Sequence, residues 1–204
     1  MPPRRYTSSR GSAASARTVE RVLDTAAALV AEDAFHTATM DDLARRAGVS
    51  RATVFTRFGS KLGVLEALSL RCASGPEMRA LREAQGIEDP VAAVDALLEA
   101  GCDLWDKEGY IMVQLKAIVV LEPDASAVID AQYADQRDGM QRLARGLAKA
   151  GLLRDGWSEA RATAALHALT SVETFMLLRR DHGLPLARVK ATIRELAHAM
   201  IAER

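Results

Sequence analysis

The sequence predicts an all-α protein with about nine helices. Apolar residues recur at spacings of three and four along most of the chain, which is the spacing of one face of a helix. Ala, Leu, Arg and Glu, which favour helices, are frequent, and no stretch alternates apolar and polar residues as a half-buried strand does. With 204 residues, 49% hydrophobic and 26% charged, the chain is long enough for one large domain or two small ones.

The first helix is expected to begin at Arg17, where an apolar face starts with Val19 and Leu23 and continues to about Ala34. The preceding residues are rich in Pro, Ser, Gly and Arg and lack this periodicity. We therefore expect residues 1–16 to form a disordered basic arm.

Two short helices follow, over residues 40–47 and 51–58. Each begins after a residue whose hydroxyl can cap it, Thr39 and Ser50, and each is followed by a glycine. Asp42 stands three residues after Thr39, as in a capping box. These signals predict a pair of short helices joined by a tight turn.

Longer helices are expected in the rest of the chain. They are predicted over 60–72, 91–107, 110–121, 124–150, 158–181 and 185–202. The expected breaks are Gly109, Pro123, residues 151–156, and Gly183 with Pro185. A connector between Gly75 and Pro90 holds one further short helical piece.

The net charge of +0 conceals an asymmetry along the chain. Residues 1–63 hold ten Lys and Arg against six Asp and Glu, a net charge of +4, and the remainder carries −4. A basic first third attached to an acidic remainder favours a polyanionic partner for the N-terminal part.

The two cysteines, Cys72 and Cys102, form no CxxC pair and have no zinc-like histidine spacing. The first 16 residues contain no apolar segment of the kind found in a signal peptide. The longest apolar run, over 111–121, is interrupted by polar residues and is far shorter than the roughly 20 residues that cross a bilayer. We expect a cytoplasmic protein with no membrane segment, no metal and no cofactor.

The two short helices are expected to pack through their apolar sides. Leu43 and Ala47 can face Val54 and Phe58 across the turn, where Gly48 permits a left-handed backbone. This packing directs four residues of the second helix outward: Arg51, Thr53, Thr56 and Arg57. Such a polar face suits the major groove of DNA, which is about 12 Å wide.

The run TMDDLARRAGVSRATVFTRFGSKLGVLEAL, residues 39–68, resembles the TetR family of transcriptional regulators. The matching positions are Thr39, Ala44, Ala47, Gly48, Val49, Ser50, Thr53, Phe58, Ser60, Lys61 and Leu65. The chain departs from the family at Phe55, where tyrosine is common, and at Leu62-Gly63, where an acidic residue is frequent. The likeness covers about residues 17–68; beyond them only the number and order of helices agree.

The resemblance implies a helix-turn-helix DNA-binding domain over 17–62 and a helical ligand-sensing and dimerisation domain over 63–204. It implies that Arg51, Ala52, Thr53 and Thr56 read bases and that Thr39, Arg57 and Lys61 contact phosphates. The complete set of expected DNA contacts is Thr39, Arg45, Ser50, Arg51, Ala52, Thr53, Phe55, Thr56, Arg57 and Lys61. Arg4, Arg5 and Arg10 of the arm either follow the DNA backbone or have no role.

The resemblance also implies a homodimer through the last two helices and a pocket for a small, largely apolar effector in the larger domain. The expected pairing stripes are Ala162, Ala165, Leu169, Val172, Met176 and Leu177, and Leu186, Val189, Ile193, Leu196, Ala197 and Met200. The alternative is that both stripes close the subunit's own core, and a wide stripe can do both. The candidate pocket residues are Leu98, Cys102, Trp105, Tyr110, Met112, Gln114, Tyr133, His167, Thr170, Glu173 and Phe175.

These features favour a ligand-responsive regulator, most simply a repressor of a palindromic operator, although no residue distinguishes a repressor from an activator. One alternative is a redox-responsive regulator that senses through Cys72 or Cys102. A small helical enzyme is a further alternative, but the scattered histidines and the lack of a GxSxG, HExxH, P-loop or GxGxxG motif disfavour it. The neutral total charge disfavours a non-specific architectural DNA-binding protein.

Overall fold

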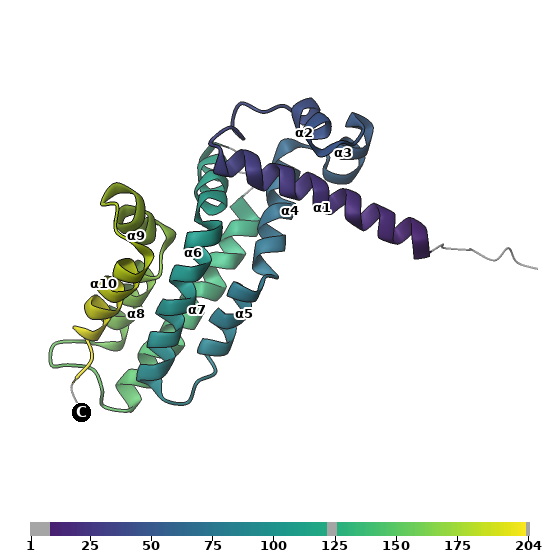
Figure 1. The fold of residues 1–204 in the computed structure, drawn as a ribbon. Helices are drawn as coiled ribbons and strands as arrows, with labels where there is room; N and C mark the ends of the chain where they lie inside the picture. Colours follow the sequence, from purple (N-terminus) through teal and green to yellow (C-terminus); the bar gives the residue numbers. More distant parts are fainter. Residues whose placement is uncertain (1–8, 122–125, 203–204) are drawn as a thin grey trace, which may run out of the picture. The chain divides into compact units, whose positions relative to one another are not determined.

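The computed structural model describes residues 9–121 and 126–202, with side chains except for 9–13, 115, 118–121 and 126–135. Over these residues the chain forms ten α-helices, α1–α10, and one π-helical segment, η2, with no β-strand (Figure 1). This confirms the all-α class, with slightly more helices than the predicted nine. The chain divides into two compact units, Met1–Arg71 and Cys72–Arg204, and the division falls within α4.

Unit 1 contains α1 (Ser9–Ala31), α2 (Met40–Ala47), α3 (Arg51–Phe58) and most of α4 (Lys61–Ala73). α2 packs against both α1 and α3. Every helix and the loop after α1 contribute to the buried core. Its fully buried side chains are Val22, Ala26, Val30, Phe35, Leu43, Val54, Val64, Leu65 and Leu68. The bounds predicted for α2 and α3 are confirmed.

The first helix is longer than predicted. It begins at Ser9 rather than Arg17, so the expectation of disorder is wrong for residues 9–16. The segment is rich in Ala and Ser, and adding residues to an existing helix avoids the cost of nucleation. The Thr18 hydroxyl also donates to the carbonyl oxygen of Ala14, 3.0 Å away. Arg4 and Arg5 lie outside the described residues.

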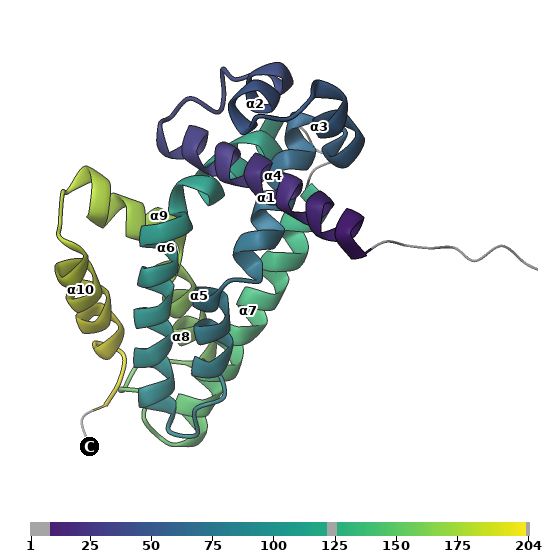
Figure 2. The same cartoon turned by 45° about the vertical axis from the view of Figure 1, so that its right-hand side comes forward.

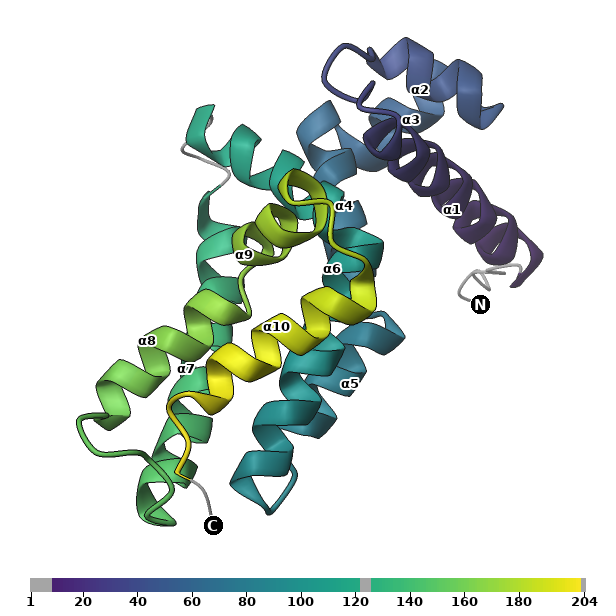
Figure 3. The same ribbon diagram turned by 60° about the vertical axis from the view of Figure 1, so that its left-hand side comes forward.

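Unit 2 is a bundle whose central element is α6. Its elements are α5 (Pro76–Ala84), α6 (Pro90–Leu121), α7 (Ser126–Lys149), α8 (Glu159–Leu169), α9 (Val172–Met176), η2 (Leu177–Asp181) and α10 (Leu186–His198). α6 lies between α5 and α10 and also packs against α7 and α9 (Figure 2). α8 packs against α7 and against α10, and α10 runs beside α8 (Figure 3).

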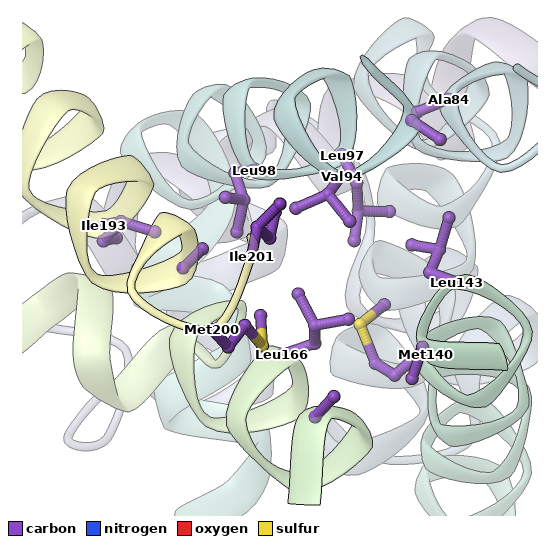
Figure 4. Packing of buried hydrophobic residues seen from close by; sticks show 14 of the residues in the cluster. Ala84, Val94, Leu97, Leu98, Met140, Leu143, Leu166, Ile193, Met200 and Ile201 are labelled. Atoms are coloured by element: carbon purple, nitrogen blue, oxygen red, sulfur yellow. The ribbon is translucent and has the colours of Figure 1, made fainter. Parts of the chain in front are cut away.

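The core of unit 2 is built from α6, α7, α8 and α10. Leu97, Leu147, Leu166 and Ile193 are among its fully buried residues. In Figure 4, side chains of these helices converge from opposite sides, and Met200 and Ile201 join them from the chain after α10. No helix in the described residues is both long enough and apolar enough to cross a membrane.

The apolar stripes predicted to pair two subunits mainly close this core. Six of their members are buried within the unit: Ala162, Val172, Val189, Ile193, Ala197 and Met200. Only Leu177 and Leu196 of the stripes are well exposed, at 49% and 53%. These six residues are therefore not open to a second subunit, because α8 and α10 direct them towards α6 and α7, and pairing through the last two helices stays a prediction for their outward sides.

The break predicted at Gly109 does not occur, and α6 runs through it as one helix of 32 residues. A Cβ atom at position 109 would lie 3.5 Å from Val172 Cγ2 and 3.6 Å from Met176 Sδ. The glycine therefore marks the place where α9 packs against α6. Because these are ordinary van der Waals distances, the position has room for a methyl group, and the helix tolerates the glycine at a cost of about 1 kcal/mol relative to alanine.

A break that was not predicted separates α8 from α9 at Thr170 and Ser171. Ser171 Oγ caps α9 by accepting from the Thr174 N–H at 3.2 Å, and Thr174 Oγ1 donates to Ala168 O at 2.7 Å. Side-chain hydroxyls thus take over bonds that a continuous helix would make. The predicted final helix, 185–202, ends earlier, at His198. Beyond it the backbone pairs with residues 152–154.

Candidate nucleic-acid interface

The start of α2 is fixed by a complete capping box. Thr39 Oγ1 accepts from the Asp42 N–H at 3.1 Å, and Asp42 Oδ2 accepts from the Thr39 N–H at 3.0 Å. The Thr39 hydroxyl also donates to Asp42 Oδ2 at 2.7 Å. Hydrogen bonds from Thr39, aided by the Arg45 charge, hold the pKa of Asp42 below its ordinary value of 3.8. Thr39, an expected phosphate contact, is thus engaged in the cap.

The turn between α2 and α3 is set by a left-handed glycine and a second cap. Gly48 has a φ of 65°, and the N–H of Val49 donates back to Ala44 O at 3.0 Å. Ser50 Oγ then accepts from the Thr53 N–H at 3.1 Å and begins α3. Leu43, Ala47 and Val54 are buried, as the sequence predicts for the facing sides of the two helices.

The opposite side of α3 is exposed and mainly polar. Arg51, Ala52, Phe55, Thr56 and Arg57 are exposed, and Thr53 is half-buried with its hydroxyl 2.7 Å from Ser50 Oγ. The core of unit 1 holds the helix from behind. This arrangement offers two cations, two hydroxyl groups and the Ala52 methyl group along one short helix, which is the chemistry that reads base edges.

The arginines near this face have partners that sequence reasoning missed. Arg51 pairs with Asp41 of α2, with 3.0 Å between Nε and Oδ1, and its guanidinium lies 5.2 Å from the centre of the Phe55 ring. Arg57 donates to Ser15 Oγ of α1. Two further pairs join Arg45 to Asp42 and Arg46 to Glu32. Arg45 and Asp42 are three residues apart in one helix. The partners of Arg51, Arg57 and Arg46 are distant in the sequence, so no local sequence pattern predicts these three pairs.

Lys61 has a structural role that the sequence did not indicate. Its ammonium donates to His36 O at 2.8 Å and Ala38 O at 3.0 Å, and it lies 5.1 Å from the centre of the Phe35 ring. Partial burial lowers the pKa of Lys61. Two of its three donors therefore hold the loop between α1 and α2.

The candidate pocket residues fall into an inner and an outer group. Leu98, Cys102, Thr170 and Phe175 are buried, and Trp105 is half-buried, with its Nε1 donating to Thr170 O. The other described candidates are half-buried or exposed: Met112, Gln114, His167, Tyr110 beneath the Arg180 guanidinium, and Glu173 paired with Lys116. The Tyr133 side chain lies outside the described residues.

The cysteines give no support to redox sensing. Burial raises the pKa of Cys102 to about 11, which keeps this thiol protonated and unreactive. Cys72 is half-buried and its Sγ donates to Glu108 Oε2 at 3.1 Å. Around Cys102 the carboxylates of Glu99, Asp103 and Asp106 raise the pKa further and oppose the lowering effect of Lys190.

Comparisons with known proteins agree with this geometry. Residues 22–68 match the model of the bacterial regulatory proteins of the tetR family. This match runs from within α1 through α2 and α3 into α4, which includes the elements described above. Among curated proteins, no sequence matches the chain.

Solved structures match over nearly the whole chain. The TetR family transcriptional regulator PfmR from Thermus thermophilus is 23% identical, with a TM-score of 0.69 over 90% of this chain and 100% of that one. A putative transcriptional regulator from Saccharomonospora viridis, solved with choline, is 22% identical, with a TM-score of 0.72 over 91% and 98%. SmeT, the repressor of the Stenotrophomonas maltophilia multidrug efflux pump SmeDEF, is 21% identical, with a TM-score of 0.67 over 91% of each chain.

At these identities the structural matches establish the fold, and the family-model match establishes the helix-turn-helix. Residues 22–68 thus carry the N-terminal unit of the tetR family of bacterial regulatory proteins, and the chain shares the all-α fold of TetR-family transcriptional regulators of known structure.

Proposed function

We propose that the chain is a ligand-responsive transcriptional repressor that binds a palindromic operator as a homodimer. The observation that carries this proposal is the exposed polar side of α3, supported from behind by a capped and buried scaffold. Arg51 bonds a guanine at O6 and N7, and Ala52 or Thr53 contacts a thymine methyl. Arg57 and the N-terminal ends of α2 and α4 contact phosphates.

Two copies are needed because one α3 reads only a few base pairs, and a palindrome presents two half-sites about 34 Å apart or a multiple of that distance. The outward sides of α8 and α10 suit the pairing surface, since the two helices lie side by side (Figure 3). Their exposed small and apolar residues include Ala160, Ala164 and Ala168 on α8 and Ala187 and Leu196 on α10. Small side chains let helices of two subunits approach closely.

A small-molecule effector releases the operator by shifting the population towards a conformer that does not fit the DNA. A coupling of about 1–3 kcal/mol between the two sites is enough for regulation. SmeT, one of the structural relatives, has been solved in complex with triclosan, and the Saccharomonospora viridis protein with choline. α4 is the continuous segment that links the two units and can transmit the shift.

Selection of bound sequences from random duplex DNA tests the proposed function. The full chain is expected to enrich a palindrome with two half-sites. Enrichment of no sequence, or of a single asymmetric half-site, contradicts the proposal.

The subunit number is tested by light scattering on two matched variants. Leu196→Glu places a charge on the outward side of α10 and is expected to give monomers. Ile87→Glu, at a residue of similar exposure in the loop before α6, is expected to leave a dimer. A monomeric parent protein, or a Leu196→Glu variant that stays dimeric, contradicts pairing through this surface.

The sensing step is tested by ligand-induced changes in melting temperature and operator affinity, with triclosan and choline as first probes. A ligand that raises the melting temperature and releases DNA supports the proposal. Ligands that bind without changing operator affinity contradict it for those compounds.

A further inference from the structure

Asp41 and Arg51 form a two-point ion pair on the face that α3 presents. Asp41 Oδ1 lies 3.0 Å from Arg51 Nε, and Asp41 Oδ2 accepts from Nη1 at 3.1 Å. The guanidinium also lies 5.2 Å from the centre of the Phe55 ring, and that ring is 41% exposed. The principal reading side chain is thus held from two sides before any DNA binds.

This pair contributes little to the stability of the fold. The side chains of Arg51 and Asp41 are 65% and 57% exposed, and ion pairs at such exposure are screened by water. The cap of α2 is already complete without Asp41, because Thr39 and Asp42 form it. Asp41 also lies in the first turn of α2, where a negative charge is favourable, so the feature left to explain is its two-point pairing with Arg51 at the surface.

A carboxylate at this place opposes non-specific DNA binding. It brings a negative charge next to the residue that would otherwise seek the nearest phosphate, and phosphate contacts supply most of the sequence-independent affinity. It also occupies two of the five N–H donors of the guanidinium. The remaining donors are held in a fixed direction, which reduces the entropy lost when they bind a base edge.

We propose that Asp41 is a positioning residue that determines specificity, because its carboxylate holds Arg51 for a base edge and away from the phosphates. This inference rests on the proposed function of α3 as the DNA-reading helix. The inference assigns a role to a residue of α2 whose negative charge would be repelled by the DNA phosphates. Asp41 acts through Arg51 and not by touching a base.

The test compares Asp41→Asn with the parent protein on the selected operator, on operators altered at each base pair, and on scrambled duplex. Asn removes the charge and keeps the shape. The matched control is Asp33→Asn, which removes one exposed charge from the loop after α1 at a φ of 55° that asparagine tolerates. Arg51→Ala identifies the base pair that Arg51 reads. The double variant Asp41→Asn, Arg51→Ala completes a double-mutant cycle, which measures the coupling between the two residues.

Asp41→Asn is expected to bind scrambled duplex more tightly, with a salt slope steeper by about one phosphate contact per subunit. Its preference at the base pair read by Arg51 is expected to fall by about three- to tenfold. Asp33→Asn should change neither quantity. In the Arg51→Ala background, Asp41→Asn should no longer alter base preference.

The proposed role of Asp41 is overturned if Asp41→Asn keeps the base preference of the parent protein. It is also overturned if Asp41→Asn lowers that preference equally with and without Arg51→Ala. Either result leaves the proposed function of α3 standing. Asp41→Ser also removes the charge, and serine is accepted in the first turn of a helix. If the charge is responsible, this variant must show the same changes in non-specific affinity and base preference as Asp41→Asn. A parent protein that enriches no sequence overturns the proposed function, and this inference with it. Thermal unfolding of each variant verifies that it is folded.

Discussion

Trp105 Nε1 on α6 donates to the carbonyl oxygen of Thr170, 2.8 Å away, at the point where α8 ends and α9 begins. Thr170 is buried, and its hydroxyl in turn donates to Leu166 O at 2.8 Å. A side chain 65 residues earlier in the chain therefore supplies a hydrogen bond at the junction of α8 and α9. Residues on α6 and the path of the last helices are coupled through this bond.

Trp105→Phe is expected to lower the free energy of unfolding by about 1–3 kcal/mol, because the variant keeps the ring but leaves the Thr170 carbonyl without the indole donor. The measurement is the urea midpoint followed by circular dichroism. The control is Trp157→Phe, whose ring lies 4.3 Å from the Arg161 guanidinium and is half-buried. Equal losses in the two variants contradict a special role for the bond to Thr170.

Gly63 is expected to be intolerant of any side chain. A Cβ atom there would lie 2.0 Å from Phe58 O, a backbone atom that cannot move without disturbing the end of α3. Gly63→Ala should destabilise the protein by about 1–3 kcal/mol. The matched control is Gly101→Ala within α6, where a Cβ meets nothing within 4 Å. That change should be neutral, or stabilising by up to about 1 kcal/mol. Gly63→Ala with the stability of the parent refutes the prediction.

The Thr39 cap is expected to make stability sensitive to acid. Because Asp42 has a lowered pKa in the folded chain, its contribution is complete above the ordinary value of 3.8 and is lost as the pH falls through the lowered pKa. Thr39→Val should raise the pKa of Asp42 towards 3.8 and flatten the loss of stability below pH 4. Carboxyl NMR titration measures the first effect and urea unfolding between pH 3 and 7 the second.

The control for this prediction is Thr37→Val, whose hydroxyl donates to Ala34 O in the preceding loop. It should leave the pKa of Asp42 unchanged. A Thr39→Val protein with the same Asp42 titration as the parent means that the capping hydrogen bonds do not set this pKa.

Cys102 is expected to resist thiol reagents until the protein unfolds. With a pKa of about 11, roughly one thousandth of this thiol is ionised at pH 8, and burial limits access to it. Cys72→Ser should therefore show no fast reaction with a disulfide reagent in buffer and one reacting thiol in denaturant. Fast native labelling of that variant, or operator binding that peroxide abolishes, would reopen the redox alternative.

The elements that could be predicted from the sequence are those with local signals. α2 and α3 begin at Thr39 and Ser50 and end at glycines, so their bounds follow from residues within one turn. α6 and α9 could not be predicted in the same way. Gly109 lies inside α6 where Val172 and Met176 of α9 pack against it, and the Thr170 carbonyl at the α8–α9 break accepts a hydrogen bond from Trp105, so both places involve partners distant in the sequence.

The candidate site shows the same division. The outward residues of α3 follow from helix periodicity and the apolar positions beside them, so Arg51 and Arg57 could be identified. Their partners, Asp41 and Ser15, lie 10 and 42 residues away and meet them only in the folded chain. The outward side of α10 could not be predicted because its apolar stripe serves the subunit core.

The most direct test of the central claim is the operator affinity of the double variant Arg51→Ala, Thr53→Ala. Fluorescence anisotropy on the selected operator and on a scrambled duplex gives the ratio of specific to non-specific binding. We expect this ratio to fall by about tenfold or more, while Arg79→Ala, an exposed arginine on α5, keeps the parent value. A double variant that retains the full ratio would show that α3 does not read the DNA sequence.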